Sequence, residues 1–234
     1  MSLAEKSTHY LEYIENWLDG LIILPIDSAA PDPDKTAIIS VDVINTFLYE
    51  GPLSSPRVAA IDEPITQLMT AAWERGVRDI LLVQDAHQED SLEFDVFGSH
   101  ALKGSHGAET VDIIKDLAFY DRLETIYKDT IFPALNNNFD DWLDKRENLE
   151  TLIVVGDVTD LCVYHMATYL RFRANAFHKN WRVILPANCV QTWHLSVEDA
   201  ELIHARPHHG DLLHAIFLHH MAVNGVEVIK EIKI

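Results

Sequence analysis

Short apolar runs that end on a polar residue or a proline recur along this chain, and segments with helical periodicity separate them. Continuous apolar runs are typical of strands buried on both faces, and strands that alternate with helices pair in parallel. We therefore predict a doubly wound, three-layer α/β/α fold with a mostly parallel sheet, in which ligands bind at the carboxyl ends of the strands. The predicted main strands are residues 36–41, 79–84, 151–155 and 182–185, with shorter ones at 125–127 and 226–229.

The N-terminal residues differ in pattern from the rest of the chain. Residues 5–19 predict an amphipathic helix, because apolar side chains follow one stripe and acids lie opposite. Residues 28–34 predict a linker, because two prolines and short polar residues disfavour a helix or a central strand. We divide the chain into an N-terminal helical extension with its linker (1–34) and one α/β domain (35–234). The helices predicted in that domain cover residues 57–75, 109–117, 140–147, a segment that includes Leu161, Cys162 and Thr168, and two stretches within 196–224.

Composition excludes several classes of function. The chain has 234 residues, 48% of them hydrophobic, which is enough for a sizeable core. Its formal net charge of −19 would repel nucleic acid and anionic lipid, so we expect neither as a partner. No run approaches the roughly 18 apolar residues of a membrane span, and the N-terminus lacks a signal-peptide core.

Cysteine usage favours a reducing compartment. The two cysteines lack the paired spacing of a zinc site or a disulfide scaffold, so we expect a cytoplasmic protein. We expect a homo-oligomer, because the apolar stripe of the N-terminal helix and the His-rich C-terminal helices need a partner surface to pack against.

Three residues of complementary chemistry fall at predicted strand ends: Asp42, Lys128 and Cys162. Cys162 follows a strand-to-helix turn and lies about one turn into the predicted helix, where the helix dipole would lower the pKa of its thiol. The alternative is a small buried hydrophobic residue, the usual role of a lone cysteine. A carboxylate could take the thiol proton and a lysine could hold both groups in place, so we predict a nucleophilic site here.

A second group lies in the His- and acid-rich loop after the second main strand. Asp85 and His87 are two apart on extended backbone, so their side chains lie on the same side, and Glu93 and His100 follow. These residues could bind Zn²⁺ or a similar divalent ion, or the segment could be a hydrogen-bonded surface loop. For the histidines after His194 we favour solvated or interface positions over a metal site, because Pro207 and Gly210 break any common helical face.

The chain resembles the isochorismatase-like cysteine hydrolases over roughly residues 36–230. The matching segments are IISVDVINTF, GDVTDLCV, YKDTIFPAL, and VQDAHQE followed by FGSHALKGSHGAE, which is similar to the metal and substrate loop of nicotinamidases. Departures fall in the pocket wall and leave the exact substrate open: Ile44 and Thr46 in the first motif, Phe97-Gly98 before His100, and Ala101 after it.

The resemblance implies an isochorismatase-like hydrolase fold and a role for each matching residue. Cys162 would be the nucleophile, Asp42 the general base and acid, and Lys128 the positioning cation. A cis peptide would join Val158 to a neighbour, and the backbone N–H groups of this Val158–Thr159 turn and of Cys162 would form the oxyanion hole. The implied metal ligands are Asp85, His87, Glu93 and His100, and the implied aromatic walls are Phe47 and Phe97.

The function we predict is therefore cysteine-dependent hydrolysis of a small planar amide, nicotinamide to nicotinate first. The expected metal is Zn²⁺, with Fe²⁺ or Mn²⁺ as alternatives. Two other readings stay open: another C–N hydrolase of the family acting on a carbamoyl or ureido substrate, and a non-catalytic scaffold that kept the fold.

Overall fold

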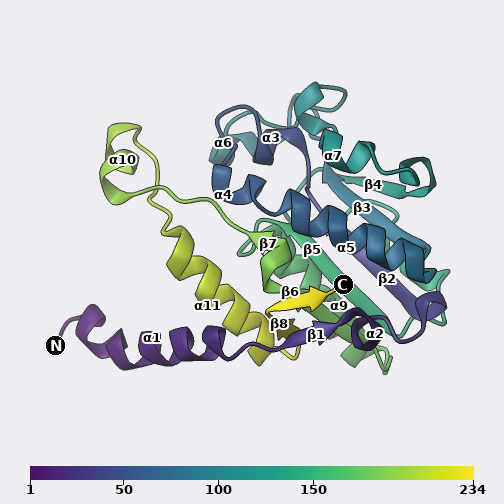
Figure 1. Cartoon of the computed structure of the whole chain (residues 1–234). Coiled ribbons are helices and arrows are strands. Elements are labelled where there is room, and N and C mark those ends of the chain that lie inside the picture. The colour runs from purple at the N-terminus through teal and green to yellow at the C-terminus, as the bar shows by residue number, and fades with distance from the viewer.

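The computed structural model describes residues 1–234 and has a central parallel sheet with helices on both faces (Figure 1). The strand order is β4-β3-β2-β5-β6-β8, β7 also pairs with β5, and every pair is parallel. This confirms the predicted three-layer fold. The strands of this sheet are β2 (Thr36–Val41), β3 (Asp79–Asp85), β4 (Glu124–Lys128), β5 (Thr151–Asp157), β6 (Arg182–Pro186), β7 (Val190–Gln191) and β8 (Glu227–Ile229).

Each face of the sheet carries its own hydrophobic core, because consecutive strand residues point to opposite faces. Leu152 and Val154 of β5 belong to a cluster of 25 buried residues, and Ile153 and Val155 to a second cluster of 24. The first core is covered by α8 (Phe139–Asp144), α9 (Cys162–Ala176) and α11 (Gly210–Val223), and the second by α5 (Asp62–Arg75) and α7 (Asp112–Lys115).

Shorter elements complete the chain. They are α3 (Asn45–Leu48), α4 (Pro56–Ala59), α6 (Phe94–Phe97) and α10 (Val197–Leu202), with 3₁₀ turns η1 (Pro33–Lys35), η2 (His106–Ala108), η3 (Tyr120–Arg122) and η4 (Ala187–Cys189). The helix predicted over 57–75 is two helices, α4 and α5. Pro64 explains the break, because it has no N–H to donate to the carbonyl of Ala60, four residues earlier.

The N-terminal residues are more structured than the predicted linker. After α1 (Leu3–Asp19), β1 (Ile23–Pro25) pairs in parallel with β9 (Glu231–Lys233), and α2 (Ile26–Ala29) follows. Three-residue strands have no readable alternation, so the sequence did not indicate them. The helix α1 lies against α11, and α1 and α10 project from the same side of the molecule (Figure 1). None of the helices combines the length and the apolar character that crossing a bilayer requires.

Candidate active site

The sheet brings Asp42, Lys128 and Asp85 together, because β2, β3 and β4 are neighbours and end at the same edge. Asp85 and Lys128 are register partners, and Asp42 directly follows Val41, the last residue of β2. All three are almost completely buried, with exposed fractions of 0%, 2% and 2% for Asp42, Lys128 and Asp85.

Lys128 contacts both carboxylates and also the thiol of Cys162. Its Nζ lies 2.8 Å from Asp42 Oδ2, 2.6 Å from Asp85 Oδ1 and 3.5 Å from Cys162 Sγ. Two carboxylates and one thiol therefore share one ammonium group, and the pKa of Lys128 is raised well above its ordinary value because these negative charges outweigh its burial. The lysine stays charged and fixes the relative positions of the other three groups.

The two oxygens of Asp42 have different partners. Oδ1 accepts a hydrogen bond from the backbone N–H of Asp85 at 2.8 Å. Oδ2 is buried and lies 2.8 Å from Lys128 Nζ, and a carboxylate oxygen of Asp42 lies within 4.8 Å of Cys162 Sγ. A buried carboxylate held in place by an ammonium group beside a thiol is an arrangement in which the carboxylate can take the thiol proton.

The ionisation of this pair corrects one sequence expectation. Burial raises the pKa of the Cys162 thiol well above its ordinary value, although Lys128 opposes the shift. The predicted lowering by the helix dipole does not prevail. Burial and the charge of Asp85 raise the pKa of Asp42 to about 7. Cys162 is therefore a thiol at rest, beside a carboxyl that titrates near neutrality.

The turn before Cys162 is shaped by a close backbone approach. Gly156 has φ +115°, and a Cβ there would lie 2.0 Å from the carbonyl oxygen of Val41, so only glycine fits. The Asp157–Val158 peptide bond is cis, one of the two places that the resemblance implied. Cys162 is the first residue of α9, where the prediction had it a turn later. The N–H groups of Val158 and Cys162 make no backbone hydrogen bond, which leaves both free for an oxyanion.

The predicted metal ligands Asp85, His87 and His100 also come together. One ligand atom from each lies within 4.8 Å of the others, and all three residues are buried. His87 Nδ1 lies 2.7 Å from Asp129 Oδ1, and His100 Nδ1 lies 2.8 Å from the carbonyl oxygen of Gly98. Both histidines therefore donate from Nδ1, and His87 Nε2 is buried without a hydrogen-bond partner. An orphaned imidazole nitrogen in a His₂Asp set, with each ring oriented by an outer acceptor, fits a divalent metal.

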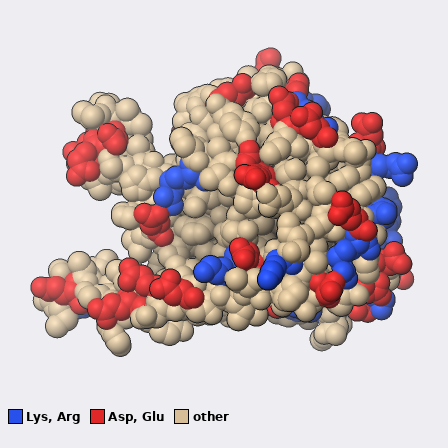
Figure 2. Space-filling model, viewed as in Figure 1, with Lys and Arg blue, Asp and Glu red and all other residues tan.

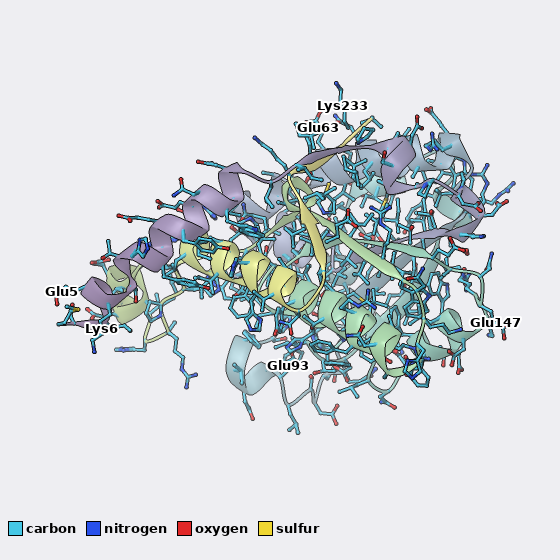
Figure 3. All side chains as sticks on the ribbon, turned by 90° about the horizontal axis from the view of Figure 1, so that it is seen from below. Glu5, Lys6, Glu63, Glu93, Glu147 and Lys233 are labelled. Carbon is cyan, nitrogen blue, oxygen red and sulfur yellow. The ribbon has the colours of Figure 1, made fainter.

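Glu93 is not part of that three-residue group. Its two carboxylate oxygens accept from the backbone N–H of Ile131 at 3.2 and 3.3 Å. Glu93, labelled in Figure 3, directly precedes α6 and makes no side-chain capping hydrogen bond to it. Glu93 still contributes a negative charge, which together with Asp85 and Asp129 raises the pKa of His87 to about 8 against the effect of burial.

The two predicted aromatic residues both lie beside His100. The ring centroids of Phe47 and Phe97 are 5.7 and 6.3 Å from that of His100. A third phenylalanine, Phe94, lies 5.7 Å from His100 and 5.5 Å from His87. The sequence reasoning missed it, although Phe94 and Phe97 are three apart and so share a helix face.

Comparison with known proteins decides the family. The profile described as the Isochorismatase domain matches residues 36–216, more than three quarters of the chain. The chain belongs to the isochorismatase family. This isochorismatase-family hydrolase is also similar to Nicotinamidase 1 of Arabidopsis thaliana, with 26% identity over 231 residues that cover 89% of this chain and 93% of the relative.

Solved structures of low sequence identity share the fold. The N-carbamoylsarcosine amidase of Thermoplasma acidophilum matches with a TM-score of 0.62 and 23% identity, over 86% of this chain and 98% of that one. A pyrazinamidase/nicotinamidase of Streptococcus mutans matches with 0.64 and 22%, over 83% and 99%. A cysteine hydrolase of Pseudomonas syringae pv. phaseolicola matches with 0.68 and 20%, over 89% and 92%.

Several residues of this isochorismatase-family site were not indicated by the sequence. Asp85 was predicted as a metal ligand only, yet it also holds Lys128 at 2.6 Å and so joins the two clusters. Asp129 directly follows Lys128, the last residue of β4. Consecutive side chains of a strand point to opposite faces, so the position of Asp129 beside the lysine was the sequence signal for it. Asp157 is fully buried beside the cluster, and nothing in an acid at a strand end distinguished it from a turn residue.

Proposed function

We propose that this protein is a cysteine amidohydrolase that cleaves a small planar amide, with nicotinamide as its first candidate substrate. The observation that carries the proposal is the buried set of Asp42, Lys128 and Cys162, in which Lys128 Nζ lies 2.8 Å from Asp42 Oδ2 and 3.5 Å from Cys162 Sγ. The similarity to Nicotinamidase 1 supports the choice of substrate.

In the proposed reaction Asp42 carries the proton at each step. Asp42 accepts the thiol proton as Cys162 Sγ bonds to the amide carbon, and the carbonyl oxygen becomes an oxyanion held by the N–H groups of Val158 and Cys162. Asp42 then gives its proton to the amide nitrogen and the C–N bond breaks. Ammonia departs, and the acyl group stays on Cys162 as a thioester. Water loses a proton to Asp42 and attacks the thioester carbon. The C–S bond then breaks, the acid is released, and Asp42 returns the proton to the Cys162 sulfur, which restores the thiol. Lys128 holds both groups throughout.

Asp85, His87 and His100 would hold a divalent metal in this proposal, Zn²⁺ first and Fe²⁺ or Mn²⁺ as alternatives. A 2-His-1-carboxylate set suits all three ions. The ion would supply Lewis-acid coordination to the ring nitrogen of the substrate, which is an anchoring role. Phe47 and Phe97, beside His100, would line the planar ring.

Ammonia release from nicotinamide tests the proposal. We expect the wild-type protein to release ammonia and Cys162→Ala to release none above background. Cys189→Ala is the matched control, because Cys189 is also a buried free cysteine but belongs to the opposite core. Equal release by wild type and Cys162→Ala would refute the mechanism.

A carbamoyl or ureido substrate is the second candidate, supported by the fold likeness to an N-carbamoylsarcosine amidase. The two candidates differ in their need for the ring nitrogen. Nicotinamide should be hydrolysed faster than benzamide, which lacks that nitrogen, and chelation should remove the difference. Faster turnover of an N-carbamoyl amino acid, insensitive to chelator, would favour the second candidate.

We also propose that the protein is a cytoplasmic homo-oligomer. The reaction needs Cys162 as a thiol, which a reducing compartment maintains. The accessible surface is 11,944 Å², against about 10,700 Å² expected for a compact monomer of this mass. The excess is larger than the roughly 800 Å² that one partner contributes to a specific interface. The projecting segments expose large apolar side chains, and Leu3, Leu202 and Ile203 are 81%, 79% and 65% exposed. Sedimentation at micromolar concentration should give a mass above that of one chain.

A further inference from the structure

The turn that supplies the proposed oxyanion donors is held from outside by the C-terminal third of the chain. The backbone N–H of Thr159 donates to the carbonyl oxygen of Gln191 at 3.0 Å. Thr159 Oγ1 lies 2.8 Å from His214 Nδ1, and Asp160 Oδ2 lies 2.8 Å from His208 Nε2. Two consecutive residues between Val158 and Cys162 therefore each have a histidine partner more than 45 residues later in the chain.

His208 is itself held on several sides. Its Nδ1 lies 3.0 Å from the carbonyl oxygen of Trp193, and its ring stacks on the Trp193 ring with centroids 3.6 Å apart. A carbonyl oxygen only accepts, so Nδ1 donates to it and Nε2 faces the carboxylate of Asp160. The backbone of His208 exchanges both hydrogen bonds with Leu195 at 2.8 Å, which closes the base of the projecting segment that carries α10. The imidazole cannot turn away from Asp160 without losing these contacts.

His214 is the acceptor in its hydrogen bond with the Thr159 hydroxyl. Burial and the positive charge of Arg57 lower the pKa of His214 to about 4, against the opposing charges of Asp160 and Asp211. The ring is therefore neutral at pH 7, and its Nδ1 can accept a hydrogen bond from the Thr159 hydroxyl. Arg57 is fixed in turn, because it lies 2.7 Å from Asp211 Oδ1 and 3.2 Å from Gln191 Oε1.

We propose that His208 and His214 are positioning residues that fix the Val158–Cys162 turn so that its N–H groups meet the oxyanion. This inference rests on the proposed amide hydrolysis and assigns a role to histidines that the sequence left as solvated or interface positions. Neither residue lies in the Asp42–Lys128–Cys162 group or in the Asp85–His87–His100 group. Their effect must pass through the backbone of the turn, since preorganised donors stabilise the oxyanion only when they are already aimed.

Three measurements separate positioning from general damage. The first is kcat and KM for nicotinamide. The second is the affinity for pyridine-3-carbaldehyde, which adds reversibly to a thiol and places an oxygen where the oxyanion forms. The third is the alkylation rate of Cys162 by iodoacetamide, which needs the thiol and its base and makes no oxyanion. The variants are His208→Gln and His214→Gln. His204→Asn is the control, an exposed histidine of the same segment whose φ of +56° asparagine tolerates.

For both variants we expect kcat and aldehyde affinity to fall together by about 10- to 100-fold, with KM and the alkylation rate within about two-fold of wild type. The control should match wild type in all three. A kcat within about two-fold of wild type would overturn the inference, and so would an alkylation rate that falls as far as kcat, because the whole site would then be disturbed.

A pair at Thr159 keeps the inference testable if a histidine variant fails to fold. Thr159→Val keeps the shape and loses the hydroxyl, and Thr159→Ser keeps the hydroxyl. The serine variant should retain at least about ten-fold more kcat than the valine variant, and equal kcat values would overturn the role of His214. If wild type hydrolyses no amide, the proposed function fails, while the aldehyde and alkylation measurements still decide whether the histidines position the turn.

Discussion

Asp42 determines the pH dependence expected of this site. A general base must be ionised, and burial with the charge of Asp85 raises the pKa of Asp42 to about 7. We therefore expect kcat/KM to rise with pH, to be half-maximal near pH 7, and to stay level above it, because the pKa of the Cys162 thiol lies well above its ordinary value. Asp42→Asn should lose about 100-fold or more of the rate. A rate that falls as the pH rises through 7 would contradict the assignment of the base.

Asp157 gives a second prediction at the scale of the residue. It is 1% exposed, its Oδ2 has no partner, and burial with the charge of Asp42 raises its pKa well above the ordinary value. The folded state therefore binds this proton more tightly than the unfolded state, so stability is lost as the pH rises above the unfolded pKa of about 4. Asp157→Asn cannot lose that proton.

The unfolding temperature of Asp157→Asn minus that of wild type should therefore be larger at pH 8 than at pH 5. We expect a gain of at least about 2 °C, since each pH unit over which only the folded state keeps this proton costs wild type about 1.4 kcal/mol. Scanning calorimetry at both pH values measures it. A difference that is the same at pH 5 and pH 8 would show that Asp157 is not a neutral acid in the folded protein.

At the scale of elements, the end of β3 and the segments on either side of α6 would supply the ligands of the proposed metal site, and Asp129, directly after β4, would orient one of them. Wild type purified with Zn²⁺ should hold about one ion per chain, and His87→Ala should hold far less. Asp129→Asn should weaken binding by about 10- to 100-fold, because Asp129 orients His87 from 2.7 Å. His106→Ala is the control, an exposed histidine of the same loop that contacts Glu50. Elemental analysis measures the metal content, and full occupancy in His87→Ala would exclude this site.

The strands that carry the candidate catalytic residues were predictable, because each buried strand is an apolar run in the sequence. β2 was predicted to the residue, and β3, β5 and β6 within two residues of their ends. β1, β7 and β9 were missed, since strands of two or three residues depend on their partners in space. The helix over 57–75 was predicted as one because apolar spacing continues across the break that Pro64 causes.

Residues at strand ends were predictable in the same way, and residues that act across the fold were not. Asp42, Asp85, Lys128 and Cys162 follow apolar runs, so a parallel sheet had to bring them to one edge. The contacts of His208 with Asp160 and of His214 with Thr159 join segments about 50 residues apart, and no local pattern indicates them. The pKa of Cys162 depends on burial, which the sequence alone could not weigh against the helix dipole.

At the scale of the whole molecule, the charge should control the proposed self-association. The net charge is −19, and acids lie on both projecting segments, including Glu5 and Glu12 on α1 and Glu198 and Glu201 on α10 (Figure 2). The same segments expose the apolar residues that would form the interface, so burial favours association and repulsion between acids opposes it.

Salt screens the repulsion and leaves apolar burial intact, so association should strengthen as salt rises. The screening length falls from about 20 Å near 20 mM to about 6 Å near 300 mM NaCl. Sedimentation velocity at the two salt concentrations should show a larger oligomeric fraction at the higher one. Leu202→Glu combined with Ile203→Glu should reduce that fraction at both, since it replaces apolar contact with charge. An oligomer that dissociates on adding salt would instead mean that ion pairs hold the chains together, and the projecting apolar segments would then have another role.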